Sequence, residues 1–129
     1  MAKEDINGES GQQWFIDLSW HEPNSRSFSA LAQGCLCPRC RGRLGGEVSA
    51  AKLLKAIGGC CSKAPDFITD RLPVLESVFR LFLANGNQPL GLDELGDELA
   101  ERRGGYRTPG VTLSRLLASD QHYGLRPVA

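Results

Sequence analysis

Five cysteines in two short clusters set the tightest limit on how this chain can fold. The first cluster holds Cys35, Cys37 and Cys40, and the second is the adjacent pair Cys60 and Cys61. Cys37 and Cys40 are separated by two residues, a spacing at which two thiolates converge on one tetrahedral metal ion. The second pair lies about twenty residues further along, within the usual range for a small structural zinc site. The sequence therefore predicts that a metal ion holds together the N-terminal half, which has little apolar material of its own.

Four of the five thiols suffice for a tetrahedral zinc ion, and the sequence leaves open which one is not a ligand. Cys37 and Cys40 are the strongest candidates, followed by the adjacent pair. Neighbouring side chains point in different directions along an extended chain, so Cys60 and Cys61 can bind one ion only where the backbone bends. Cys35 is therefore the alternative ligand. Inert core thiols are the competing interpretation, but two clusters beside glycine, proline and basic residues do not look like core.

An all-thiolate donor set without an evident open position favours a structural over a catalytic metal site. Zinc is the expected cofactor. An iron–sulfur cluster is the alternative, because it also uses four thiolates.

The size of the chain suits one ordinary domain or two very small ones. It has 129 residues, of which 41% are hydrophobic and 23% charged, as in typical globular proteins. Residues 1–13 are polar, and we expect a disordered tail there rather than a secretory signal. No apolar run is long enough to cross a membrane. We therefore expect a cytoplasmic protein whose reduced thiols bind metal rather than form disulfides.

Charge is segregated along the chain, although the formal net charge is zero. Segment 39–63 has six basic residues against Glu47 alone, and segment 102–126 has five arginines against Asp120 alone. An acidic stretch, 93–101, lies between them. The zero net charge argues against simple electrostatic binding of nucleic acid, whereas the two basic segments favour local phosphate contacts.

Sequence periodicity and capping residues predict the elements of the N-terminal half. Trp14, Ile16, Leu18 and Trp20 alternate on one face, the pattern of a half-buried strand. The expected order is a strand over 14–20, a short helix capped by Ser25 or Ser27 and ending at Gln33, a basic loop over 41–46, and a helix from Ser49 to Gly59.

Helical periodicity dominates from residue 69 onward. Apolar residues recur every three or four positions through 72–83, which predicts the strongest helix of the sequence. The expected order is this helix, capped by Thr69 or Asp70 and ending at 85–87, a compact helix over 92–101, a third helix from Thr108-Pro109 to 120–122, and a closing strand over 123–128. The closing strand could pair with the strand over 14–20.

This order of elements resembles a winged-helix domain over residues 72–129. The resemblance is carried by Leu72-Pro73-Val74-Leu75 in the first helix, residues 92–99 in the second, Thr108-Pro109 to Leu117 in the recognition position, and Tyr123-Gly124-Leu125 at the wing strand. The family implies duplex DNA binding, with the third helix in the major groove and the wing on the backbone. The sequence departs from the family in having no second wing strand before Ala129.

The resemblance also implies which residues would contact DNA. The outward positions of the third helix and the strand are Arg107, Thr112, Arg115, Ser119 and Arg126. Basic residues beside the cysteines would add phosphate contacts, and these are Arg39, Arg41 and Arg43. Winged helices also serve as protein-docking modules, so a protein partner is the alternative.

Catalysis is not indicated. His21 and His122 are the only histidines, and the sequence contains no readable serine–histidine–acid set, phosphate loop or paired-carboxylate pocket.

We therefore predict an α+β, mostly helical, non-enzymatic protein. A metal-binding unit over 14–68 would pack on a winged-helix-like domain over 69–129 that includes a small β-sheet. The predicted function is that of a zinc-binding, DNA-binding transcriptional regulator. The alternatives are a winged-helix protein-interaction adaptor and an iron–sulfur or redox sensor that uses the same cysteines.

Overall fold

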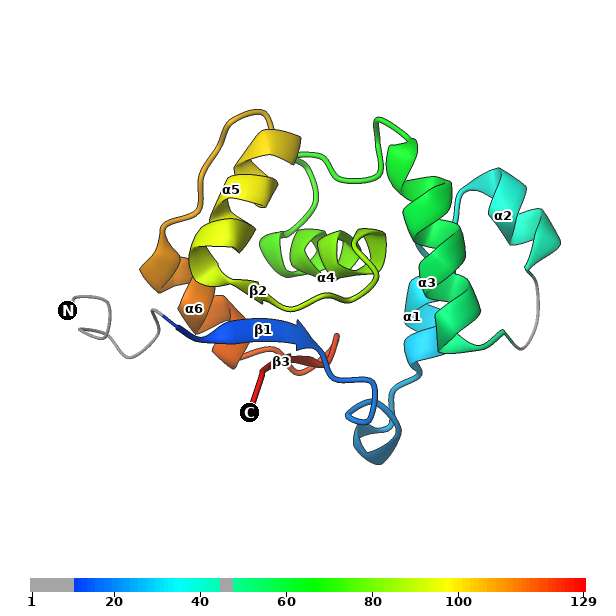
Figure 1. Cartoon of the computed structure of the whole chain (residues 1–129), viewed down its shortest axis with the longest axis horizontal. Helices are drawn as coiled ribbons and strands as arrows, with labels where there is room; N and C mark the ends of the chain where they lie inside the picture. Colours follow the sequence, from blue (N-terminus) through cyan, green and yellow to red (C-terminus); the bar gives the residue numbers. More distant parts are fainter. Residues whose placement is uncertain (1–10, 45–47) are drawn as a thin grey trace.

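The computed structural model describes residues 11–44 and 48–129, in which a small antiparallel sheet lies along one side of a group of short helices (Figure 1). The elements, in chain order, are β1 (Gln13–Ile16), η2 (Glu22–Asn24), α1 (Phe28–Gln33), α2 (Pro38–Arg43), α3 (Ala50–Gly59), η3 (Cys61–Lys63), α4 (Val74–Ala84), β2 (Leu90–Gly91), α5 (Leu92–Arg102), α6 (Gly110–Ala118) and β3 (Leu125–Pro127). The predicted mixture of helices with a small sheet is confirmed. No helix among the described residues is long and apolar enough to cross a membrane.

The sheet joins segments from both ends of the described chain. β1 lies in the centre and pairs antiparallel with β2 on one side and with β3 on the other. Trp14 is opposite Leu90 in β2 and Pro127 in β3. Ile16 is opposite Leu125. The predicted pairing of the N-terminal strand with the closing strand is confirmed.

β1 is shorter than the strand predicted over 14–20. It ends at Ile16 because Asp17 begins a turn, in which its carboxylate accepts hydrogen bonds from the backbone N–H and the hydroxyl of Ser19. Such local side-chain bonds compete with the strand ladder. Leu18 is consequently 43% exposed, so its predicted place on the buried face is wrong.

Serine caps begin two of the N-terminal helices. The side chain of Ser27 accepts a hydrogen bond from the backbone N–H of Ala30 at the start of α1. Ser49 accepts one from the backbone N–H of Lys52 at the start of α3. Both predicted caps are confirmed, as is the end of α3 at Gly59.

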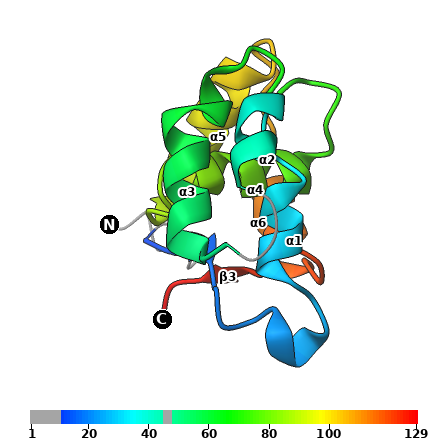
Figure 2. The same ribbon diagram turned by 90° about the vertical axis from the view of Figure 1, so that its right-hand side faces the viewer.

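Part of the basic loop predicted over 41–46 is helical. α2 begins with Pro38 in its first turn, where the fixed φ of proline suits a helix, and it continues through Arg43. Residues 45 and 46 of the predicted loop lie outside the described residues. α2 lies beside α3 in both views of the molecule (Figure 2).

α4 starts later than its sequence pattern predicts. Its N-cap is Pro73, not Thr69 or Asp70. The Thr69 hydroxyl instead accepts a hydrogen bond from the backbone N–H of Arg71, which forms a local turn before the helix. The first residue of α4 is therefore set by the proline, since proline fixes φ and has no N–H to place inside a helix.

The segment after α4 is tied to β1 by one side chain. The amide of Asn87 donates a 2.9 Å hydrogen bond to the carbonyl of Ile16 and accepts one of 2.9 Å from its N–H. Asn87 has a φ of 62°, a left-handed conformation that asparagine tolerates better than most residues. This link fixes the end of α4 against the sheet.

One apolar cluster runs through both parts of the chain. Its centre is α4, where Val78, Phe79, Phe82 and Leu83 are at most 1% exposed. The N-terminal half contributes buried apolar residues to the same cluster, namely Trp14, Ile16, Phe28, Ala32, Leu36, Leu53, Ile57, Phe67 and Ile68. The expectation that this half has little apolar material of its own is therefore wrong.

The structure bears on only some of the domain boundaries that the sequence predicts. Residues 1–10 of the predicted tail lie outside the described residues, whereas Gln13 belongs to β1. The division into units over 14–68 and 69–129 stays a prediction. β1 belongs to the first predicted unit, yet it lies between two strands of the second.

Candidate metal centre

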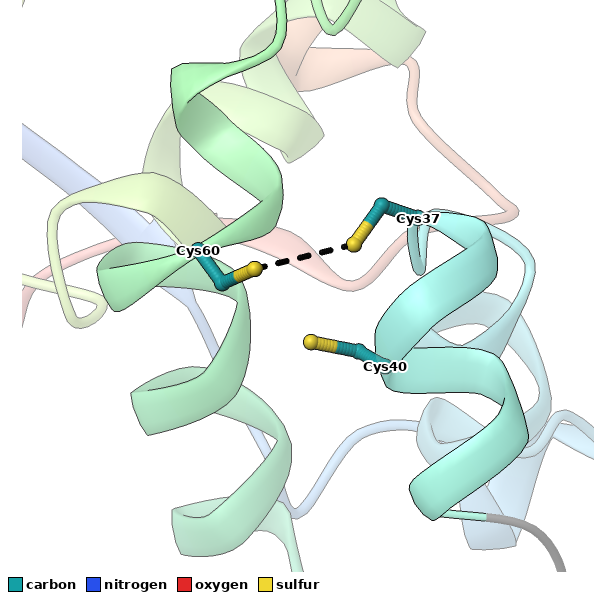
Figure 3. A group of neighbouring side chains, drawn as sticks. All are labelled: Cys37, Cys40 and Cys60. Atoms are coloured by element: carbon teal, nitrogen blue, oxygen red, sulfur yellow. Dashed lines mark hydrogen bonds between the residues drawn. The ribbon is translucent and has the colours of Figure 1, made fainter.

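The thiols of the centre come from the start of α2 and the end of α3. Cys37 is the N-cap of α2, and Cys40 follows one turn later on the same side of the helix. Cys60 is the C-cap of α3. Figure 3 shows the side chains of Cys37, Cys40 and Cys60 pointing toward one another across the space between the two helices.

The distances between these sulfurs suit a single metal ion. The Sγ atoms of Cys37, Cys40 and Cys60 all lie within 4.8 Å of one another. The Sγ atoms of Cys37 and Cys60 are 3.8 Å apart. Zinc–sulfur bonds of about 2.3 Å at tetrahedral angles place two sulfur ligands about 3.8 Å apart. These three cysteines could therefore hold a metal ion.

Cys61 lies beside this group without being one of its three mutually close members. Its Sγ atom is 3.4 Å from the Sγ atom of Cys37 and accepts a 3.2 Å hydrogen bond from the Cys37 backbone N–H. The backbone leaves the α-helical region at Cys60, where φ is −136° and ψ is −65°, and η3 begins at the next residue. This bend lets two adjacent side chains approach Cys37.

Cys35 does not join this thiol group. Its Sγ atom donates a 3.6 Å hydrogen bond to the carbonyl of Leu31, one turn earlier in α1. Burial raises the pKa of the Cys35 thiol. Cys35 therefore behaves as a core thiol, which is the role that the sequence analysis considered for all five.

The thiols of the centre differ in acidity. The pKa of Cys37 is lowered to about 6, chiefly by the hydrogen bond from the Cys40 backbone N–H and then by the Cys61 thiol. Burial raises the pKa of Cys61 to about 12. Hydrogen bonds to Cys40 and Cys37 raise the pKa of Cys60. Without a cation, the group thus concentrates negative charge on Cys37, and metal binding must remove protons from its neighbours.

The three arginines beside the centre have different surroundings. Arg41 donates a 3.1 Å hydrogen bond from Nη2 to the carbonyl of Leu36. Nη2 of Arg43 donates a 3.8 Å hydrogen bond to the Sγ atom of Cys40. Arg39 is exposed.

The arginines predicted around the third helix are largely engaged within the protein. Arg107 forms an ion pair with Asp97. Nη1 of Arg126 donates to the backbone carbonyls of Asp120 and Leu125, and its guanidinium lies 4.9 Å from the centre of the Trp20 ring.

The remaining predicted residues lie on α6 or at its end. Arg115 is exposed, and its guanidinium makes no hydrogen bond or ion pair with another described residue. Thr112 is half-buried, and the hydroxyl of Ser119 donates to the carbonyl of Leu116. α6 and α2 lie toward opposite ends of the long axis (Figure 1), so the structure does not bring the two predicted sets of DNA contacts together.

Sequence reasoning missed a pocket next to the thiols. It has a volume of about 170 Å³, and its walls include Cys35, Cys37, Cys61 and Arg80. The Nε atom of Arg80 is buried and has no hydrogen-bond partner among the described residues. No local pattern marks this pocket, because its walls come from separate parts of the sequence: the segment between α1 and α2, η3 with the loop that follows it, and α4.

No family model, curated protein or solved structure matches this chain. What the chain does must therefore be argued from its side chains. Among the described residues, Cys37, Cys40 and Cys60 form a group with ligand chemistry and spacing that suit a metal ion.

Proposed function

We propose that this chain is a non-enzymatic zinc-binding protein whose C-terminal helices bind duplex DNA, as in a transcriptional regulator. The mutual approach of the Cys37, Cys40 and Cys60 sulfurs within 4.8 Å carries the metal part of the proposal. Cys61 supplies the fourth thiolate, and Cys35 is the cysteine left out. Four protein ligands close the coordination sphere of zinc, which makes the site structural.

The close spacing favours zinc over an iron–sulfur cluster. A four-iron cluster holds each cysteine sulfur on a separate iron and therefore spreads the sulfurs more widely than one ion does. The 3.8 Å separation of the Cys37 and Cys60 sulfurs fits ligands of the same ion.

Metal analysis of the protein purified under reducing conditions tests this part. We expect a colourless protein with one zinc ion per chain. Cys40→Ser should lose the metal, whereas the matched Cys35→Ser variant should keep it. A brown protein that absorbs visible light would instead identify an iron–sulfur cluster, and a metal-free wild type would refute the centre.

The order and pairing of elements in the C-terminal half support the DNA-binding part. α4, β2, α5, α6 and β3 follow one another in the winged-helix order. The sheet order is β2-β1-β3, so β1 occupies the position beside β3 that a second wing strand would take. α6 is the helix in the recognition position, where it would enter the major groove.

Two exposed arginines, one at the end of α5 and one on α6, are available for phosphate contacts. Arg102, at the end of α5, and Arg115 are exposed, and their guanidinium groups make no hydrogen bond or ion pair with other described residues. Neutralising phosphates with such side chains releases counterions and makes binding salt-dependent.

A gel-shift titration with random duplex at low salt tests DNA binding. We expect binding that weakens as salt rises, and Arg115→Glu should weaken it several-fold. Lys55→Glu makes the same change of charge on an exposed residue of α3 and should have a smaller effect. The absence of salt-dependent binding in the wild type would refute this part of the proposal.

Protein docking is the second candidate, and the surface around α6 favours it. Tyr106 and Val111 are 69% and 68% exposed, and they lie just before and at the start of α6. The exposed carboxylates of α5 repel phosphates but attract a basic protein surface, and they belong to Asp93, Glu94, Asp97, Glu98 and Glu101. Tyrosine and arginine are also frequent among residues that dominate protein interfaces.

One pair of variants distinguishes the two candidates. If the chain docks on a protein, combined Tyr106→Ala and Val111→Ser changes should abolish capture of a defined partner. Arg115→Glu should then leave any nucleic-acid signal unchanged. If the chain binds DNA, Arg115→Glu should weaken the gel shift more than the combined Tyr106→Ala and Val111→Ser changes do.

A further inference from the structure

One pair of sulfurs in the thiol group is closer than the ligands of a single zinc ion need to be. The Sγ atoms of Cys37 and Cys61 are 3.4 Å apart, whereas tetrahedral zinc places its sulfurs about 3.8 Å apart. A disulfide requires about 2.05 Å. The two sulfurs would have to approach by about 1.35 Å to form this bond.

The same two thiols line the pocket beside the centre. Its volume of about 170 Å³ is sufficient for a molecule of a few heavy atoms. Cys37 and Cys61 belong to its walls, whereas the other two thiols of the centre, Cys40 and Cys60, do not. A small molecule in this pocket would therefore meet the sulfurs of Cys37 and Cys61 first.

We propose that a small hydroperoxide enters this pocket and converts Cys37 and Cys61 into a disulfide, which expels the metal ion. The site is a redox modification site, and its substrate class is hydrogen peroxide or a small organic hydroperoxide. This inference rests on the proposed zinc centre, because it names how that same centre is regulated.

Exposure determines which sulfur reacts first. Cys37 is half-buried, whereas Cys61 is 1% exposed, so the oxidant reaches Cys37. The Cys37 sulfur attacks one peroxide oxygen, the O–O bond breaks, and the other oxygen leaves as water or an alcohol. The Cys61 sulfur then attacks the sulfenic acid at Cys37, the S–S bond forms, and the hydroxyl leaves as water. Two sulfurs are oxidised by one electron each, and one peroxide is reduced by two.

Loss of the metal follows from the number of donors. The disulfide removes two of the four thiolates and leaves only Cys40 and Cys60. Two thiolates do not complete a structural zinc site. Oxidation and metal binding therefore exclude each other, and a thiol reductant together with zinc should restore the centre.

Peptide mapping of the oxidised full-length protein tests the inference. Zinc-loaded and metal-free reduced samples are treated with hydrogen peroxide, alkylated and digested with trypsin. The sequence predicts that the disulfide joins the peptide over 27–39 to the peptide over 56–63, since Cys40 is cut into a separate fragment. Fragmentation of the joined peptides should assign the bond to Cys37 and Cys61. A chromophoric chelator should detect one zinc ion released per disulfide.

Two variants provide matched controls. Cys35→Ser changes a thiol in the same peptide and should leave the joined product unchanged, whereas Cys37→Ser should abolish it. A bond assigned to Cys35 or Cys60, no bond at all, or zinc that stays bound after the bond forms would overturn the inference. A reduced wild type without metal would refute the proposed zinc centre, and the metal-free sample would still show whether Cys37 and Cys61 pair.

Discussion

Asp120 is a buried carboxylate that organises the turn between α6 and β3. It is 1% exposed, and its two oxygens accept hydrogen bonds from the backbone N–H groups of His122, Tyr123 and Leu125. Asp120→Asn would place an amide NH2 against these donors, so we expect a loss of about 2 kcal/mol in the free energy of unfolding. Urea denaturation measures this loss. Asp93→Asn, on the exposed face of α5, is the control, and equal losses in both variants would contradict this role of Asp120.

Zinc affinity should fall as the pH is lowered from 8 to 6. Cys60 and Cys61 have raised pKa values, so they enter the reaction as thiols and must lose protons to become ligands. Cys37, with its pKa of about 6, loses its thiolate only at the acidic end of this range. Competition with a chelator of known pH dependence measures the zinc affinity. A zinc affinity that does not change between pH 8 and pH 6 would exclude Cys60 and Cys61 as ligands.

Single residues at the centre show what spacing alone can specify. The two-residue gap predicted that Cys37 and Cys40 lie together, since a helix turn places them on one side. The sequence predicted that α3 ends at Gly59, but not the φ and ψ at Cys60 that let the adjacent thiols approach Cys37. Cys35 lies outside the group and donates instead to the carbonyl of Leu31 in α1, which spacing also could not indicate.

At the scale of elements, we expect the proposed metal to stabilise α2 more than any other helix. It has six residues, and helices of this length are unstable unless tertiary contacts hold them. Cys37 and Cys40 are its links to the end of α3, so removal of zinc should release it. We expect a strong chelator to increase deuterium uptake over 38–43.

The rest of the molecule provides the reference for this exchange experiment. Peptides from α4 should change little, because its apolar residues are buried in the main cluster. Equal uptake over 38–43 with and without the chelator would show that α2 is held by packing rather than by the metal.

Element boundaries were predictable where periodicity was long and capping was unambiguous. The long repeat over 72–83 predicted α4, and Ser49 predicted the start of α3. The strand predicted over 14–20 was longer than β1, because the Asp17 side chain replaces the strand ladder with a turn. The helical part of 41–46 was missed because an arginine- and glycine-containing segment favours a loop, whereas the structure continues it from Pro38.

At the scale of the whole molecule, the shared sheet and core predict one cooperative unit. β1 lies between β2 and β3, and the buried cluster includes Ile57 from α3 as well as Phe82 from α4. Unfolding in urea should therefore give the same midpoint by tryptophan fluorescence, which reports on Trp14 and Trp20, and by far-ultraviolet circular dichroism, which reports on the helices. Two separate transitions would instead support independent domains over 14–68 and 69–129.

Ile16 provides the sharpest test of this coupling, because it is fully buried in the central strand. Truncating a buried isoleucine removes apolar contacts and leaves a cavity, so Ile16→Ala should lower the free energy of unfolding by about 3 kcal/mol. If β1 joins the two parts into one body, both spectroscopic transitions should shift together by this amount. Leu18→Ala removes a similar side chain two residues later, where it is 43% exposed, and should cost much less. A shift confined to one transition would show that β1 stabilises only the part in which it lies.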